Sequence, residues 1–126
     1  MQSVKVGSVA LSTPQIAVAK ADLFRALAHP ARIRVLELLV DGEHSVGAMA
    51  ELLNVDLPPL SQQLAVLRNA RIVTTRREGS MVFYRVTDPR MSQLLVTAKQ
   101  LLATELRTGL ELLDSLEANL PGHVRS

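Results

Sequence analysis

The sequence predicts a mainly α protein with one β-hairpin, an α+β fold, in a single domain. Two observations carry this prediction. Apolar residues recur at helical spacing through most of the 126-residue chain. Between positions 72 and 86 the pattern changes to β-branched residues and strict alternation on either side of a glycine. Hydrophobic residues make up 48% of the chain and charged residues 21%, which is typical of a chain that folds around a core.

A proline near the start of each of the first two helices predicts where that helix begins. Thr13-Pro14 reads as an N-cap followed by the first helical residue, where proline sacrifices no hydrogen bond, and the helix is expected to reach about Ala28. His29-Pro30 repeats the signal. The second helix should end at Asp41-Gly42, since glycine readily takes up the backbone conformation that follows a helix.

Two shorter helices follow, and together they predict a helix-turn-helix over residues 46–69. Ser45 can cap the first of them, which runs from 46 to 53, and Asn54 suits its left-handed exit. The second opens at Asp56 or at the Pro58-Pro59 pair, because proline is harmless in a first turn. Its Leu60, Leu64 and Leu67 are assigned to the core.

Residues 72–86 predict a β-hairpin with its turn at Glu78-Gly79-Ser80, glycine standing where a tight turn needs it. A long helix is then expected over residues 89–120, opened by Thr87-Asp88-Pro89. The prediction is completed by a flexible N-terminal arm over 1–12 and a C-terminal tail over 121–126. Residues 13–120 form the one domain.

The net charge of +2 is unevenly distributed. Residues 68–90 contain six arginines against Glu78 and Asp88, so this segment has a net charge of +4. The planar guanidinium of arginine donates two parallel hydrogen bonds to a phosphate. A helix-turn-helix followed at once by a cationic hairpin is the pattern of a winged helix. In a winged helix the second helix of the helix-turn-helix enters the major groove of DNA, and the hairpin, called the wing, contacts the flanking backbone.

Composition excludes several other classes of function. Cysteine is absent, which excludes disulfides, thiolate metal sites and thiol redox switches. The three aromatic residues are too few to stack a row of single-stranded bases. The chain has no paired carboxylates or nucleophile with a base, so an enzyme is not expected. No apolar run approaches the ~18 residues of a membrane span, and a cytoplasmic protein without membrane contact is expected.

Three segments carry a resemblance to a known family. They are residues 27–36 (LAHPARIRVL), 60–70 (LSQQLAVLRNA) and 76–84 (RREGSMVFY), and in this order the chain from about Leu23 to Arg90 resembles the ArsR/SmtB family of winged-helix repressors. The resemblance implies a homodimer that binds an inverted-repeat operator in double-stranded DNA and represses transcription until a signal releases it.

The resemblance also implies which residues contact DNA. Ser61, Gln62 and Gln63 stand where the family has its contacting triplet, and glutamine can pair with adenine through two hydrogen bonds. Pro58 and Pro59 replace the usual serine or threonine. Phosphate contacts are expected from cations at the end of the recognition helix and in the wing. The full set is Pro58, Pro59, Ser61, Gln62, Gln63 and Arg68 in the helix, and Arg76, Arg77, Gly79, Ser80 and Arg85 in the wing.

The long N- and C-terminal helices are expected to form the dimer interface. The last helix carries a leucine stripe at three-four spacing that a small domain has little interior to bury, and a stripe of this length exposed to water would be unusual for a monomer. The interface residues are Ile16, Leu23, Leu102, Leu106, Leu110, Leu113 and Leu116.

No cofactor or metal is expected. The stretch that carries cysteine in the family's metal sensors is here residues 46–51 (VGAMAE), and the last helix has no histidine between Pro89 and Leu120. Three possibilities remain open for the signal: an organic small molecule at the dimer interface, control by protein abundance, or a protein partner. The alternative function is a winged helix used for protein–protein contact, with only non-specific affinity for DNA.

Overall fold

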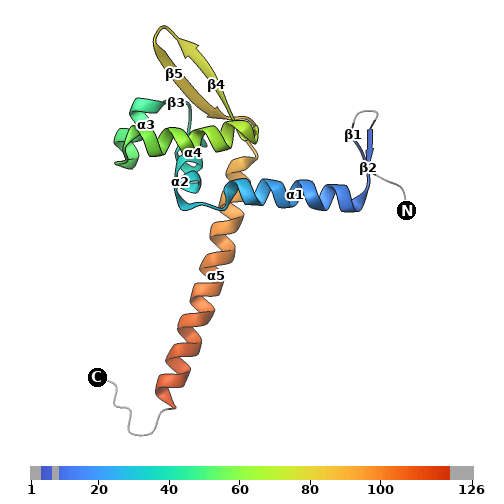
Figure 1. The fold of residues 1–126 in the computed structure, drawn as a ribbon. Coiled ribbons are helices and arrows are strands. Elements are labelled where there is room, and N and C mark those ends of the chain that lie inside the picture. Colours follow the sequence, from blue (N-terminus) through green and yellow to red (C-terminus); the bar gives the residue numbers. More distant parts are fainter. Residues whose placement is uncertain (1–3, 7–8, 120–126) are drawn as a thin grey trace. The chain divides into compact units, whose positions relative to one another are not determined.

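The computed structural model describes residues 4–6 and 9–119 (Figure 1). The chain divides into two compact units, residues 1–89 and 90–126. That residues 13–120 form a single domain stays a prediction. The first unit contains four helices and the sheet of the wing. The second contains one long helix in its described part.

The helices of the first unit are α1 (Thr13–Leu27), α2 (Pro30–Leu39), α3 (Val46–Leu53) and α4 (Leu57–Asn69). The predicted caps of α2 and α3 are confirmed. The Nδ1 atom of His29 accepts from the backbone N–H of Ala31 at 3.1 Å, and the hydroxyl of Ser45 accepts from the N–H of Ala48 at 3.2 Å. Asn54 ends α3 with a φ of 53°, the predicted left-handed exit.

The start of α1 was predicted one residue too late. Its N-cap is Ser12 and not Thr13, so Pro14 is the second helical residue. The Ser12 hydroxyl accepts from the Gln15 N–H, and the Gln15 side chain accepts from the Ser12 N–H at 2.9 Å. This reciprocal capping box satisfies two backbone N–H groups that a helix start otherwise leaves without a partner. Thr13 in the N-cap position could not form it, because the residue three positions later is Ile16, which has no polar side chain.

Three strands form an antiparallel sheet in the order β3-β5-β4. The predicted hairpin is confirmed as β4 (Val73–Glu78) and β5 (Met81–Val86), joined by Gly79 and Ser80, with a φ of 61° at Gly79. The third strand, β3 (His44–Ser45), was not predicted. A strand of two residues is too short to show any periodicity, and only its pairing with Phe83 and Tyr84 of β5 defines it.

The core of the first unit lies where α2, α3 and α4 meet the sheet. Leu36 and Leu39 of α2, Met49 of α3, and Leu64 and Leu67 of α4 are each at most 2% exposed. Val73 and Tyr84 close the core from the sheet. The three predicted core leucines of α4 are confirmed as buried, and they determine which face of that helix remains outside.

Two short strands, β1 (Val4–Val6) and β2 (Val9–Leu11), pair with each other in the segment predicted to be a flexible arm. The β-branched Val4 and Val6 suit β1 and Val9 suits β2, but segments of three residues are too short to show a periodic pattern.

The second unit is formed by α5 (Met91–Ala118), which begins two residues later than predicted. Residues 87–90 form the turn before it, so Thr87-Asp88-Pro89 precedes the helix without belonging to it. The predicted end at Leu120 and the tail over 121–126 lie outside the described residues. No residue of α5 is buried in the part of the chain that the structure describes. None of the described helices is long and apolar enough to cross a membrane.

The C-terminus of α4 has a backbone conformation that its side chain disfavours. Arg71 has a φ of 61°, and the N–H groups of Arg71 and Ile72 donate to the carbonyls of Arg68 and Leu67, each at 2.9 Å. This pattern is a Schellman motif, in which glycine is the preferred residue at the left-handed position.

Replacing Arg71 with glycine should therefore stabilise the fold by about 0.5–1 kcal/mol, since relief of left-handed strain exceeds the added entropy of the unfolded chain. Urea unfolding at one fixed protein concentration measures the change. Ala70→Gly is the matched control and should destabilise, because Ala70 has right-handed φ and ψ of −81° and 0°. A loss of stability in Arg71→Gly would show that the arginine side chain stabilises this turn.

Candidate nucleic-acid interface

The outer face of α4 is a polar stripe opposite its buried leucines. Pro58, Gln62, Ala65 and Asn69 recur at helical spacing on the side away from Leu60, Leu64 and Leu67. Pro58, Gln62 and Asn69 are exposed and Ala65 is half-buried. Ser61 lies beside this stripe and is also exposed. The stripe therefore presents a glutamine, an asparagine and a hydroxyl on one accessible surface.

The two adjacent glutamines have different environments. Gln62 is exposed, whereas Gln63 is half-buried and its Oε1 atom accepts from the Nη1 of Arg32 at 2.9 Å. The Nε of Arg32 donates in turn to the Ala26 carbonyl at 2.7 Å, so Arg32 of α2 links α4 to the last turn of α1. Gln63 was predicted as one of three equivalent contact residues. In the structure, its carbonyl oxygen already has a partner.

The N-terminal turn of α4 is apolar and exposed. Leu57 is 51% exposed, Pro58 and Pro59 are exposed, and the Asp56 side chain makes no capping hydrogen bond. Of the two predicted starts, the helix follows Asp56. This turn offers methylene groups where a serine or threonine would offer hydroxyls.

In the wing, Arg76 is held by other protein groups. Its guanidinium contacts Glu43 at 2.7 Å and Glu78 at 2.7 Å, and lies 4.4 Å from the centroid of the Phe83 ring. Arg76 and Phe83 are cross-strand partners, and Glu43 immediately precedes β3. Arg76 was predicted as a phosphate contact. In the structure it pairs with Glu43 and Glu78 and lies over Phe83, so it connects β4 and β5 to the segment before β3.

The same cluster shifts the titration of its groups. The hydrogen bond from Arg76 lowers the pKa of Glu43, with smaller contributions from the charges of Arg76 and Arg85. The hydrogen bonds that Arg76 donates to Glu43 and Glu78 raise the pKa of Arg76. Glu43 was not predicted from sequence as part of the wing, since it lies 33 residues before Arg76 and no local pattern joins the two.

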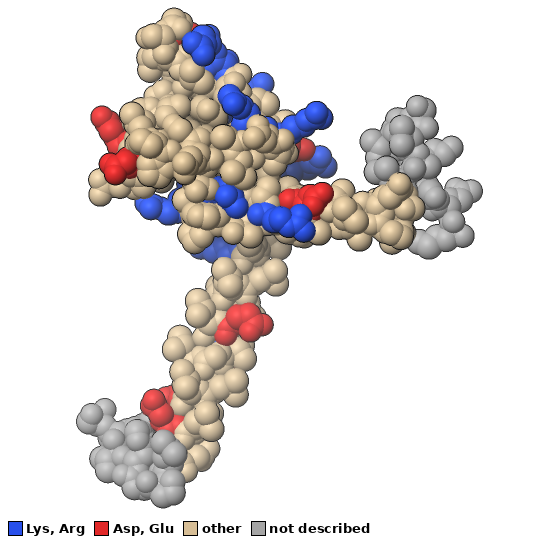
Figure 2. Space-filling view, in the orientation of Figure 1, with Lys and Arg blue, Asp and Glu red and all other residues tan. Residues whose placement is uncertain are grey.

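The other predicted cations have no ion pair among the described residues. Arg68 ends α4, Arg77 lies near the tip of β4, and Arg85 lies on β5, all three exposed. Gly79 and Ser80 form the exposed tip of the hairpin. Figure 2 shows Lys and Arg side chains gathered over the hairpin and around its foot, which is the region of excess positive charge identified in the sequence.

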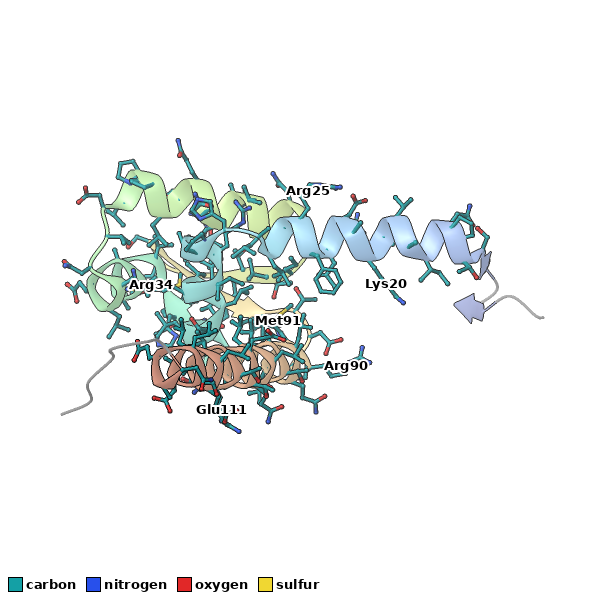
Figure 3. The ribbon with its side chains drawn as sticks, turned by 90° about the horizontal axis from the view of Figure 1, so that it is seen from below. Lys20, Arg25, Arg34, Arg90, Met91 and Glu111 are labelled. Carbon is teal, nitrogen blue, oxygen red and sulfur yellow. The ribbon has the colours of Figure 1, made fainter. Side chains whose placement is uncertain are left out.

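The predicted interface leucines of α5 are exposed. Leu102, Leu106, Leu110, Leu113 and Leu116 are each between 57% and 67% exposed. On α1, Ile16 is half-buried and Leu23 is 36% exposed, and its neighbours Val18 and Phe24 are also exposed. Figure 3 shows Lys20 on a part of α1 that extends beyond α4. Both helices thus carry apolar side chains that their own units do not cover.

Metal-ligand side chains are scattered. Over residues 4–6 and 9–119, no group of three His, Asp or Glu side chains lies close enough together to hold a metal ion. The lack of cysteine applies to the whole chain. That neither metal site of the family works here stays a prediction.

Three helices packed on a three-stranded sheet, with an uncovered recognition helix and an arginine-rich wing, define a winged helix-turn-helix protein. Residues 27–76 match the model of a helix-turn-helix domain family. The HTH-type transcriptional regulator Rv0081 of Mycobacterium tuberculosis is 46% identical over 103 residues, which cover 79% of this chain and 88% of that protein. The crystal structure of Rv0081 superposes with a TM-score of 0.70 at 42% identity, covering 79% of this chain and 99% of the other.

Two further relatives extend the comparison. The transcriptional repressor SmtB of M. tuberculosis is 34% identical over 67% of this chain and 62% of its own length. A homodimeric winged helix-turn-helix DNA-binding domain from Mycobacterium bovis, described as a possible ArsR-family regulator, has a TM-score of 0.67 at 28% identity, covering 78% of this chain and 93% of that domain. The chain belongs to the ArsR/SmtB family of winged-helix transcriptional regulators.

The Glu43–Arg76 pair makes a prediction about pH. Because the pKa of Glu43 is lowered in the folded state, the pair stabilises the fold at pH values above the ordinary glutamate pKa of 4.5 and loses this contribution as the pH falls below it. The difference in unfolding free energy between the wild type and Glu43→Gln should be constant above about pH 5 and shrink toward pH 3.

Urea unfolding of both proteins across this range measures the difference. Glu51→Gln is the control, since Glu51 is an exposed carboxylate of α3 with no ion pair among the described residues. A difference between wild type and Glu43→Gln that does not change with pH would mean that Glu43 acts through packing alone.

Proposed function

We propose that this protein is a homodimeric repressor that binds an inverted-repeat operator in double-stranded DNA. The observation that carries the proposal is the accessible outer face of α4, which presents Gln62 and Asn69 with Ser61 beside them. The same unit contains Arg68, Arg77 and Arg85, which have no ion pair among the described residues. A helix of this kind fits the major groove, and cations at its end and in the wing suit the phosphates on either side.

Base reading is assigned first to Gln62. Its side chain is exposed on the outer stripe, so both its amide N–H groups and its carbonyl are available for the two hydrogen bonds that adenine offers in the major groove. Ser61 beside it can contact a phosphate or a base edge. Gln63 is less available, since it is half-buried and its carbonyl oxygen already accepts one hydrogen bond from Arg32. The exposed Pro58 and Pro59 suit contact with thymine methyl groups.

Phosphate binding is assigned to Arg68, Arg77 and Arg85, with Gly79 and Ser80 approaching the backbone at the tip of the wing. Arg76 is excluded from this set because Glu43 and Glu78 neutralise it. Its proposed role is to orient the wing, so that Arg77 and Arg85 are presented to DNA.

Dimerisation is assigned to the apolar faces of α1 and α5. A second copy of the chain would cover Ile16 and Leu23 of α1 and the leucine stripe of α5, removing from water the apolar surface that the isolated chain exposes. A two-fold dimer presents two recognition helices, which is why an inverted repeat is the expected operator. Support for repression comes from the family and from SmtB, which is a transcriptional repressor.

Contact with another protein is the alternative, and the apolar first turn of α4 favours it. Leu57, Pro58 and Pro59 would suit a protein groove as well as a row of thymine methyls. This alternative predicts weak DNA binding without sequence preference.

Fluorescence anisotropy with DNA from upstream of the protein's own gene, against a scrambled duplex at several salt concentrations, tests the proposal. A preference of about 10³-fold or more is expected for the native duplex.

Two variants distinguish residues that contact bases from residues that contact phosphates. Gln62→Ala should cost about 1–3 kcal/mol on the native duplex and little on the scrambled one. Arg77→Ala should weaken both and lower the slope of log K against log salt by about one.

Arg25→Ala is the control for these variants, since Arg25 lies on α1 and pairs with Asp22. Equal affinity for the two duplexes would favour the protein-binding alternative. If Gln62→Ala and Arg77→Ala had the same effect, the division into base and phosphate contacts would be wrong.

A charge in the leucine stripe of α5 should separate the protomers. Leu106→Glu is expected to give monomers with much weaker operator binding, because a carboxylate would be buried in an apolar interface. Light scattering after gel filtration measures the mass. Thr104→Glu is the matched control and should remain dimeric. Thr104 precedes Leu106 by two residues and so lies on the opposite side of the same helix. A dimeric Leu106→Glu would place the interface elsewhere.

A further inference from the structure

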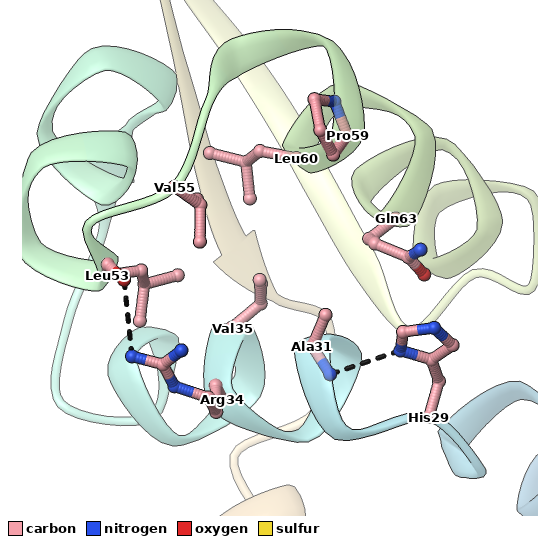
Figure 4. Close-up of a pocket in the computed structure, with 9 residues that line it drawn as sticks. All are labelled: His29, Ala31, Arg34, Val35, Leu53, Val55, Pro59, Leu60 and Gln63. Carbon is pink, nitrogen blue, oxygen red and sulfur yellow. Dashed lines mark hydrogen bonds between the residues drawn. The ribbon is translucent and has the colours of Figure 1, made fainter.

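The first unit contains a cavity of about 160 Å³ between α2, α4 and the turn that joins α3 to α4. Its middle is apolar and is formed by Val35, Leu53, Val55 and Leu60 (Figure 4). Arg34 lies at one end, and His29 and Gln63 lie together at the other. None of the residues that line it is acidic.

The polar groups at the two ends offer mainly donors. The Nδ1 of His29 accepts from the Ala31 N–H, so the neutral ring carries its proton on Nε2. The Oε1 of Gln63 accepts from Arg32, which leaves its two amide N–H groups. One nitrogen of Arg34 donates to the Leu53 carbonyl at 3.2 Å, and the rest of this guanidinium has no partner among the described residues.

The size of the cavity suits one ring or a short branched chain. Cavities of about 150 Å³ lined by aliphatic side chains accept benzene. The cavity has a permanent cation at one end, donors from His29 and Gln63 at the other, and no acidic residue in its lining. These features favour an anion with an apolar body, and the fork of an arginine matches a carboxylate.

We propose that this cavity is a binding site for a small carboxylate with an apolar body, such as a benzoate or a branched short-chain acid. Its carboxylate pairs with Arg34, and its hydrocarbon part contacts Val35, Val55 and Leu60. A further oxygen atom at the opposite end of the ligand would accept a hydrogen bond from the Nε2–H of His29 or from the side-chain amide N–H groups of Gln63.

The same site is placed to affect DNA binding. Pro59 and Gln63 belong to the recognition helix and also line the cavity, so a bound ligand contacts α4 directly. Its negative charge neutralises Arg34 and adds no attraction for phosphates, so binding of the acid should weaken operator binding. This effect rests on the proposed function, whereas binding of the acid does not.

Binding is tested by adding sodium benzoate to the ¹⁵N-labelled full-length protein and following its ¹H–¹⁵N NMR spectrum. Saturable shifts are expected at Arg34, Val55 and the side-chain amide of Gln63. Benzyl alcohol, which lacks the charge, and inorganic phosphate, which lacks the apolar body, should bind more weakly by about tenfold or more, the loss of one charged hydrogen-bonded contact.

Two variants and their controls locate the site. Arg34→Gln should weaken benzoate binding by about tenfold or more, and Arg34 is exposed, so its loss leaves the core intact. Ala31→Leu should fill the cavity and abolish binding. Arg25→Gln on α1 and Ala103→Leu on α5 should bind as the wild type does. Shifts that do not saturate, equal saturation by phosphate, or unchanged binding in Arg34→Gln would each overturn the proposal.

The effect on DNA is tested separately by repeating the anisotropy titration with saturating benzoate. Operator affinity should fall in the wild type and remain unchanged in Arg34→Gln. If benzoate saturates the cavity but the native duplex is not preferred over the scrambled one, the proposed function fails and the binding site stands. If the native duplex is preferred but benzoate does not saturate, the binding site fails alone.

Discussion

The packing of the α2 and α4 leucines around Met49 is the contact on which the rest of the first unit depends. Leu36, Leu39, Leu64 and Leu67 are almost completely buried, and burial of each contributes about 1.5–3 kcal/mol. Because these side chains fix the rotation of α4 about its own axis, they also decide which of its residues face outward. The exposed stripe of Pro58, Gln62 and Asn69 is a consequence of where the leucines point.

The charges of the wing have two different structural roles. Arg76 is neutralised by two carboxylates and lies over Phe83, so it joins β4 to β5 and to the segment before β3. Arg77 and Arg85 have no ion pair among the described residues and retain their full charge for a partner. An excess of positive charge in a segment therefore overstates the number of cations that a phosphate can reach.

Gln63 connects the outer face of α4 to the interior of the unit. Its oxygen is held by Arg32, which itself is held by the Ala26 carbonyl, and its side chain closes one end of the cavity between α2 and α4. Pro59 and Gln63 of α4 both line that cavity, so a molecule bound there would contact the helix directly.

The sequence by itself determined the elements whose signals are local. Ser45, His29 and Asn54 mark helix ends through hydrogen bonds that span two or three residues, and Gly79 marks the turn of the hairpin, so helices and wing were predictable. The residue types of the candidate site, Ser61, Gln62 and the arginines, were likewise visible as a pattern. Only the tertiary structure decided which of them are available. Gln63 meets Arg32 across 31 residues and Arg76 meets Glu43 across 33, and β3 exists only because β5 pairs with it. Such contacts depend on how the helices pack, and neither periodicity nor composition contains that information.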